Sequence, residues 1–254
     1  MGVFDSGMGG LSVLRVLRHH LQHENWVYFA DSAHAPYGEK SQGEITDRAL
    51  TIVRQLREQH RIKALVVACN TATAAAIATL REQHPDLPIV GIEPGIKPAL
   101  VLSQTRHIGV MATRRTIHSE KFQRLLASAQ TQAHFTVQPC DGLALAIETQ
   151  DHSKTEALIA LYTGAMGTFG TKNEAMDTLV LGCTHYPLAA HELHRRVGPH
   201  VTLIDPAQGV TRQLERLLAH SHQLATGPGI GKITGCGTAD LVELHAAMHR
   251  WCSP

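Results

Sequence analysis

The sequence predicts an α/β protein built from two similar three-layer halves, each with a largely parallel sheet. Short apolar or β-branched runs alternate with longer stretches of helical periodicity. Many of the short runs are apolar on both faces, as expected for strands that helices cover on both sides. One strand-to-helix junction also recurs 114 residues further along the chain. A chain of 254 residues is long enough for two domains, each with its own core.

Short runs that end in a turn residue are predicted to be strands. The predicted strands are Gly2 to Phe4, Trp26 to Ala30, Ala64 to Ala68, Ile89 to Ile92, Ile108 to Met111, Phe135 to Gln138, Leu179 to Leu181, Val201 to Ile204 and Lys232 to Thr234. The stretches between them are predicted to be amphipathic helices, with charged residues opposite an apolar face. One such face combines Leu11, Leu14, Val16, Leu17 and Leu21, and another combines Ile45, Ala49, Ile52, Val53 and Leu56.

The recurring junction contains a cysteine. Cys69 ends the run Leu-Val-Val-Ala-Cys and Cys183 ends the run Leu-Val-Leu-Gly-Cys, and polar residues that would begin a helix follow each. Their separation is about one domain length. The Pro-Gly-Ile-Lys-Pro run at 94–98 marks a boundary, and with the elements after Asp205 returned to the first half we predict one domain from 1–93 plus 206–254 and another from 94–205. Ligands bind beyond the carboxyl ends of parallel strands, so we expect the active site there, and the family resemblance described below implies that it lies in a cleft between the domains.

The matched context of the two cysteines favours a chemical role. A cysteine at a helix N-terminus gains thiolate character from the backbone N–H groups. The alternative is that each cysteine is a small buried apolar side chain. Two thiols that face each other across a cleft suit the removal of a proton from one face of a carbon and delivery to the other. Such a site inverts a stereocentre.

A glycine-rich turn, Asp-Ser-Gly-Met-Gly-Gly at residues 5–10, follows the first predicted strand. Its glycine spacing does not match the dinucleotide-binding pattern. Ser6 and the helix N–H groups would suit a carboxylate, and Asp5 would hold an ammonium group or assist proton transfer at Cys69. The alternative is that Asp5 or Ser6 only caps the following helix.

Other polar residues give weaker signals. The segment Pro36-Tyr37-Gly38 is either an anion-binding loop or an ordinary turn. His185 suits an acid or base partner of the thiol two residues before it, or a structural role. Glu148 closes an apolar run and is a further candidate. Cys140, Cys236 and Cys252 lack the strand-to-polar-turn context, and we assign them no role.

Composition excludes several classes of partner. Lys and Arg total 23 against 22 Asp and Glu, which leaves a formal charge of +1 and no strong field for nucleic acid. Apolar runs fall short of the roughly 20 residues that span a bilayer. The five cysteines are an odd number, and no signal segment opens the sequence. We therefore expect a cytoplasmic protein with no nucleic-acid or membrane partner, and a homodimer remains open.

Several blocks, in this order along the chain, resemble bacterial glutamate racemases. They are Val-Phe-Asp-Ser-Gly-Met-Gly-Gly-Leu-Ser at 3–12, Ala30-Asp31 with Pro36-Tyr37-Gly38, Ala-Cys-Asn-Thr-Ala-Thr at 68–73, residues 91–98, and Leu-Gly-Cys-Thr-His-Tyr-Pro-Leu at 181–188. The resemblance extends to Thr113 and Thr116, to Cys140 followed by Glu148, and to residues 203–205. It covers essentially the whole chain.

The resemblance implies a cofactor-independent isomerase that interconverts L- and D-glutamate and supplies D-glutamate for peptidoglycan. It implies that Cys69 acts on the D enantiomer with help from Asp5, and Cys183 on the L enantiomer with help from His185. Glu148 matches a further acidic site residue, and no cofactor or metal is implied. The implied substrate contacts are Asp5, Ser6, Tyr37, Gly38, Asn70, Thr71, Thr113, Thr116, Thr184 and His185.

Two alternatives remain. One is a racemase for aspartate or another small amino acid, although the Cys69 and Cys183 blocks favour glutamate. The other, from a different class, is a non-enzymatic thiol or metal-binding protein that uses the cysteines and some of the 18 histidines. The Cys-x-x-Cys pairs common in zinc sites do not occur in the chain.

Overall fold

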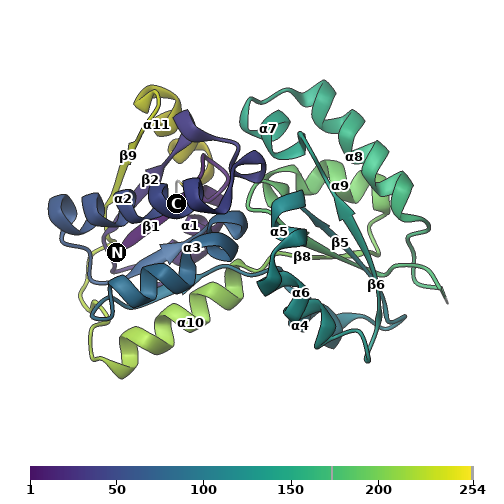
Figure 1. Cartoon of the computed structure of the whole chain (residues 1–254), viewed down its shortest axis with the longest axis horizontal. Helices are drawn as coiled ribbons and strands as arrows, with labels where there is room; N and C mark the ends of the chain where they lie inside the picture. The colour runs from purple at the N-terminus through teal and green to yellow at the C-terminus, as the bar shows by residue number, and fades with distance from the viewer. Residues whose placement is uncertain (173, 253–254) are drawn as a thin grey trace. The chain divides into compact units, whose positions relative to one another are not determined.

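The structure, a computed structural model, describes residues 1–172 and 174–252. It divides into two compact units (Figure 1). The first unit combines Met1–Ile92 with the segment from Ala207 onward, and the second is Glu93–Pro206. Each contains a wholly parallel sheet with helices on both faces. The predicted α/β class is confirmed.

The sheet of the first unit has the strand order β4-β3-β1-β2-β9. Its strands are β1 (Gly2–Asp5), β2 (Trp26–Ala30), β3 (Leu65–Val67), β4 (Ile89–Gly91) and β9 (Ile233–Gly237). Its helices are α1 (Leu11–His20), α2 (Gln42–His60), α3 (Asn70–Gln83), α10 (Ala207–His220) and α11 (Leu241–Cys252).

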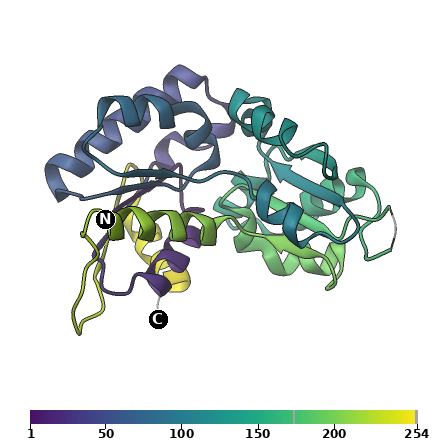
Figure 2. The same cartoon turned by 90° about the horizontal axis from the view of Figure 1, so that it is seen from below.

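Alternation along the strands builds a core on each face of this sheet. Val3 packs with side chains of α1, α10 and α11, whereas the next residue, Phe4, packs with side chains of α2 and α3. The C-terminal segment therefore completes the first unit. Figure 2 shows that yellow-green and yellow segment among the purple and blue elements of the N-terminal part.

The sheet of the second unit has the strand order β6-β5-β7-β8. One core involves α7, α8 and α9, and the other involves α4, α5 and α6. The strands are β5 (His107–Ala112), β6 (His134–Pro139), β7 (Thr178–Gly182) and β8 (Thr202–Ile204). The helices are α4 (Ile96–Leu102), α5 (Arg114–His118), α6 (Glu120–Ala127), α7 (Leu143–Glu148), α8 (His152–Met166) and α9 (Ala190–Val197).

Each predicted strand overlaps a strand of the structure, and the largest difference is in β9. This strand continues to Gly237, beyond the predicted end at Thr234. A Cβ at Gly235 would lie 2.6 Å from the Met248 sulfur, and one at Gly237 would lie 2.3 Å from the Ala30 carbonyl oxygen. Glycine lowers strand propensity in a sequence, but here it allows close packing against α11 and β2.

The two cysteine junctions also differ. Asn70 begins α3 directly after Cys69, as predicted. The matching prediction for Cys183 is wrong, because a turn and the 3₁₀ helix η3 (Tyr186–Ala189) precede α9. Pro187 explains the difference, since proline lacks the N–H group and disfavours helical geometry in the residue before it.

Candidate active site

Cys69 lies at the carboxyl end of β3 and caps the N-terminus of α3. The Ala72 N–H donates to its sulfur at 3.4 Å, and the thiol donates to the Ser6 hydroxyl at 3.6 Å. Its side chain is buried. Helix N–H groups stabilise negative charge at this position, so the surroundings of the sulfur suit a thiolate.

Asp5 is the last residue of β1, the neighbour of β3, so it lies at the same edge of the sheet as Cys69. Its buried carboxylate accepts a hydrogen bond of 2.7 Å from the Gly10 N–H. A Cβ at Gly10 would lie 2.6 Å from the Asp5 Cβ, so glycine allows the start of α1 to approach the carboxylate. Asp5 therefore bonds to the residue that precedes α1 and does not cap the helix, and it lies at the strand end where we expect the substrate.

Asn70 and Thr71 follow Cys69 in the first turn of α3, and both are buried. Among the described residues, neither the oxygen nor the nitrogen of the Asn70 amide has a hydrogen-bond partner. Buried amides almost always have a partner, because burial without one costs about 1–3 kcal/mol. This amide is therefore a candidate for ligand binding.

Tyr37 begins the 3₁₀ helix η2 (Tyr37–Glu39), and its side chain is buried. Its hydroxyl donates to Asp31 at 2.5 Å, and its ring meets Phe4 edge-on at a centroid distance of 6.3 Å. Burial and the bond to Asp31 both raise the pKa of the phenol above its usual range. The hydroxyl is thus bonded to the protein, so a substrate contact by this segment would come from the backbone of Tyr37 and Gly38.

In the second unit, Cys183, His185 and Glu148 form a continuous chain of polar contacts. The Cys183 sulfur lies 3.7 Å from His185 Nδ1, and His185 Nε2 lies 2.6 Å from Glu148 Oε2. Burial alone would lower the pKa of His185, but hydrogen bonds and charges of Cys183 and Glu148 raise it well above its usual range. The three residues have the arrangement of a thiol, an imidazole and an orienting carboxylate.

Two glycines help to build this chain of contacts. Gly142 has φ 75° and lies just before α7, the helix that ends at Glu148. Gly182 ends β7 directly before Cys183, and a Cβ there would lie 2.8 Å from the Met111 carbonyl oxygen. The sequence indicated His185 and Glu148 separately, and only the fold brings them into contact.

The threonines of the second unit lie near the same strand ends. Thr113 follows β5, the neighbour of β7, and its hydroxyl donates to the Thr116 hydroxyl at 3.0 Å. Thr116 and Thr184 are buried. The structure therefore places Thr113 at the sheet edge where Cys183 lies.

The three other cysteines, Cys140, Cys236 and Cys252, differ from Cys69 and Cys183. Burial raises the pKa of Cys140 above its usual range, and it raises the pKa of Cys236 and of Cys252 to about 11. Thiols with such pKa values are protonated at neutral pH and are poor nucleophiles or bases. This agrees with the sequence analysis, which assigned them no role, but the reason given there is wrong for Cys140, which directly follows β6 and precedes the turn before α7.

Within the part of the chain that the structure describes, no three His, Cys, Asp or Glu side chains come together as a metal site would require. None of the helices within 1–172 and 174–252 is long and apolar enough to cross a membrane.

Sequence reasoning assigned no site role to Asp31, Arg48 or Thr238. Asp31 follows β2 and belongs to one of the blocks that carry the family resemblance, but that block gave it no specific role. Arg48 comes from the middle of α2 and Thr238 from the turn after β9, where no sequence signal distinguishes them. Their contacts with Asp31 depend on the fold.

Comparison with known proteins identifies the class to which this fold and these strand-end thiols belong. Residues 10–214 match the family described as Asp/Glu/Hydantoin racemase. The match spans most of the chain, which therefore belongs to that family.

Individual relatives narrow the comparison. The chain is 46% identical over 250 residues to a glutamate racemase of Ralstonia pickettii, covering 98% of this chain and 86% of the relative. A glutamate racemase isoform of Bacillus anthracis has a similar structure, with TM-score 0.85, 32% identity and coverage of 98% and 92%. An Escherichia coli glutamate racemase, solved with L-glutamate and the activator UDP-MurNAc-Ala, has TM-score 0.84, 30% identity and coverage of 98% and 94%.

Proposed function

We propose that this protein is an isomerase that interconverts L- and D-glutamate without a cofactor, using Cys69 and Cys183 as its two proton-transfer groups. The observation that carries the proposal is that each unit has a buried cysteine just beyond the carboxyl end of a parallel strand, with a polar side chain, Ser6 or His185, at its sulfur. The names of the similar proteins support glutamate as the substrate.

The reaction we propose is a two-base proton transfer. In the L-to-D direction, the Cys183 thiolate takes the Cα proton and leaves a carbanion, and the Cys69 thiol delivers its proton to the opposite face. Cys183 ends as a thiol and Cys69 as a thiolate, which is the state that begins the D-to-L direction. Both thiols must therefore act on one bound substrate.

The polar groups around each thiol have distinct proposed tasks. His185 stabilises the Cys183 thiolate, and Asp5 assists Cys69. The unpartnered Asn70 amide binds the substrate, together with Ser6, Thr71 and the backbone at Tyr37 and Gly38. Thr113, Thr116 and Thr184 supply hydroxyl contacts from the second unit. Hydrogen-bond donors around the carbanion stabilise its charge.

The wider role we propose is the supply of D-glutamate for peptidoglycan in the cytoplasm. The formal charge of +1 supports a small-molecule substrate rather than a nucleic-acid partner. Whether the protein acts as a homodimer is a separate question, which the mass in solution would answer.

Racemisation of L-glutamate in D₂O tests the reaction. We expect optical rotation to be lost and the D-glutamate formed to carry deuterium at Cα. Product that retains its original hydrogen would contradict the two-base scheme. A parallel panel with aspartate and other small amino acids tests the alternative substrates, and stoichiometric metal without racemisation would favour the non-enzymatic alternative.

Serine variants test the two thiols. We expect Cys69→Ser and Cys183→Ser each to reduce kcat roughly 100-fold or more, because a hydroxyl is a far weaker base than a thiolate. Cys236→Ser is the matched control and should retain activity. Circular dichroism of the protein checks that each variant folds, and near-normal activity in a folded Cys69 or Cys183 variant would remove that residue from the mechanism.

A further inference from the structure

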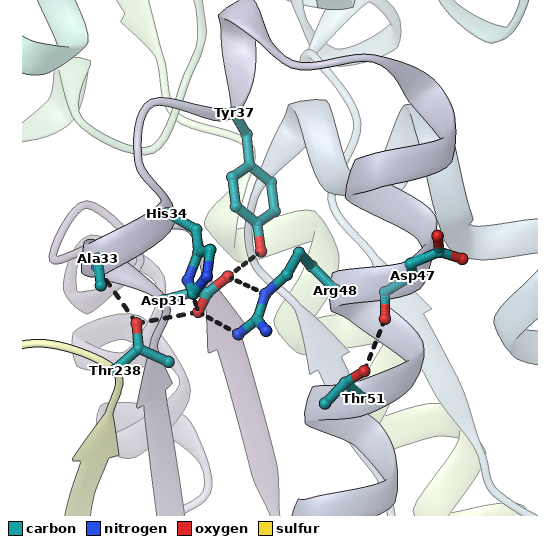
Figure 3. Close-up of polar contacts among 8 residues, drawn as sticks. All are labelled: Asp31, Ala33, His34, Tyr37, Asp47, Arg48, Thr51 and Thr238. Carbon is teal, nitrogen blue, oxygen red and sulfur yellow. Dashed lines mark hydrogen bonds and ion pairs between the residues drawn. The ribbon is translucent and has the colours of Figure 1, made fainter.

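A buried carboxylate outside the proposed mechanism joins three parts of the first unit (Figure 3). Asp31 follows β2, and its side chain is fully buried. Arg48 donates to both of its oxygens, from Nε at 3.0 Å and from Nη2 at 2.7 Å. The Tyr37 hydroxyl donates at 2.5 Å, the Thr238 hydroxyl donates at 3.0 Å, and His34 Nδ1 lies 3.1 Å away. We call these five residues the Asp31 network.

The network holds its members together strongly. Burial alone would raise the pKa of Asp31, but the hydrogen bonds from Arg48, Tyr37 and Thr238 keep it below its usual range. Asp31 is therefore ionised at neutral pH, and hydrogen bonds to a charged acceptor are stronger than neutral ones. The donors come from α2, from η2 and from the turn after β9. Thr238 also accepts from the Ala33 N–H at 3.2 Å, which fixes the segment that leads to Tyr37.

The segment that the network holds lies beside Cys69. Helix η2 packs against α3, the helix that Cys69 caps. The Tyr37 ring belongs to the same apolar cluster as Cys69 and Ala72. With the Tyr37 hydroxyl tied to Asp31 and its ring packed on Phe4, the Pro36–Gly38 turn has little freedom to move.

We propose that Arg48 and Thr238 are positioning residues, which act through Asp31 and Tyr37 to hold the Pro36–Gly38 turn in its substrate-binding position and thereby set KM. This rests on the proposed function, in which the backbone of that turn contacts glutamate. Arg48 and Thr238 bond to the Asp31 carboxylate, whereas the Cys69 sulfur contacts Ser6 and the Ala72 N–H. Loss of either should therefore weaken substrate binding more than it slows proton transfer.

The first test removes the guanidinium. We expect Arg48→Met to raise KM for glutamate about tenfold, since it removes two hydrogen bonds to a buried charge, with kcat within about threefold of wild type. The fall in kcat/KM should be equal for both enantiomers, because a racemase has an equilibrium constant of one. Arg54→Met, an exposed residue on the same helix, is the matched control and should leave KM unchanged.

The second test changes one hydroxyl and guards against a folding defect in the arginine variant. Thr238→Val keeps the shape of the side chain and removes the donor, whereas Thr238→Ser keeps the donor. We expect KM to rise roughly three- to tenfold in the valine variant and to return close to the wild-type value in the serine variant. Equal KM values in the two variants would overturn the role of Thr238.

A third measurement does not depend on the substrate. Hydrogen–deuterium exchange of the free protein should show faster exchange over residues 36–40 in Arg48→Met and Thr238→Val than in wild type or Arg54→Met. If the wild-type protein does not racemise glutamate, the proposed function fails while this test of positioning still stands. Unchanged exchange and unchanged KM, or a fall in kcat with KM unchanged, would overturn the proposal.

Discussion

At the scale of single residues, the two proposed proton-transfer groups have different surroundings. The Cys69 sulfur contacts a backbone N–H and the Ser6 hydroxyl, whereas the Cys183 sulfur faces an imidazole that is bound to a carboxylate. His185 carries the raised pKa, so an imidazolium persists beside Cys183 to higher pH than for an ordinary histidine. This pairing predicts how activity depends on pH.

Removal of the carboxylate should move the alkaline limit of activity. In Glu148→Gln, the bond and the negative charge that raise the pKa of His185 are lost, so the imidazolium deprotonates at lower pH. We expect the alkaline limb of the kcat/KM profile to move to lower pH, by on the order of one pH unit. The measurement is the rate of racemisation between pH 6 and pH 10, with circular dichroism as the readout.

The control for this change is Glu156→Gln. Glu156 pairs with Arg195 on the exposed surface of the same unit, so its loss should leave the profile unchanged. An alkaline limb at the wild-type position in Glu148→Gln would show that Glu148 does not act through His185.

Much of the candidate site follows from the sequence at this scale, because strand ends and the residues after them are local features. Cys69, Cys183 and Asp5 are examples. The partners Arg48 and Thr238 are different, because they lie 17 and 207 residues from Asp31. No local pattern specifies such contacts.

At the scale of elements, a second buried carboxylate fixes a connection. Asp177 precedes β7 and accepts hydrogen bonds from the Ser103 hydroxyl and from the N–H groups of Gln104 and Thr105, which join α4 to β5. Burial alone would raise its pKa, but these bonds and one from Thr178 lower it. The carboxylate therefore stabilises the loop that leads into β5, one of the two inner strands of the second sheet.

Asp177→Asn should destabilise the protein by about 1–3 kcal/mol, since the amide places a donor opposite backbone donors. Because the pKa of Asp177 is lowered on folding, its contribution is present above the unfolded pKa and is lost as the pH falls through the folded value. Urea unfolding should therefore show a difference between variant and wild type at pH 7 that shrinks towards pH 3.

Asp86→Asn provides the comparison. Asp86 is 65% exposed and pairs with Arg57, so its loss should change stability much less than the loss of Asp177 does. A variant at position 177 that is as stable as wild type at pH 7 would contradict the proposed role of this carboxylate.

At the scale of the whole molecule, the chain begins and ends in the same unit. The last strand, β9, pairs with β2, and Leu214, Leu244 and Met248 of the C-terminal segment belong to the core around Val3. The second unit is a single continuous segment. We propose that the units are separate folding domains with the boundaries predicted from the sequence, after residues 93 and 205.

Two fragments test this organisation. A fragment of 94–205 should fold on its own. Its amide signals in an NMR spectrum should be dispersed, and its thermal unfolding should be cooperative. A fragment of 1–93 should not fold on its own, because it lacks the apolar side chains of α10 and α11. Burial of each such side chain contributes about 1.5–3 kcal/mol, and the net free energy of unfolding of a protein is only about 5–15 kcal/mol. Joining 206–254 to residues 1–93 should restore cooperative unfolding, and a 1–93 fragment that folds alone would contradict the division.

The sequence alone determined the class of fold, the position of Cys69 and Cys183 at strand ends and the resemblance to a family, because apolar periodicity and strand-end motifs are local. The tertiary structure decided what periodicity does not encode. It extended β9 through its glycines, replaced the predicted helix after Cys183 by a 3₁₀ helix, and brought Glu148 to His185 and Arg48 to Asp31. Contacts between residues far apart in the chain depend on how the elements pack, and that is settled only when the whole core forms.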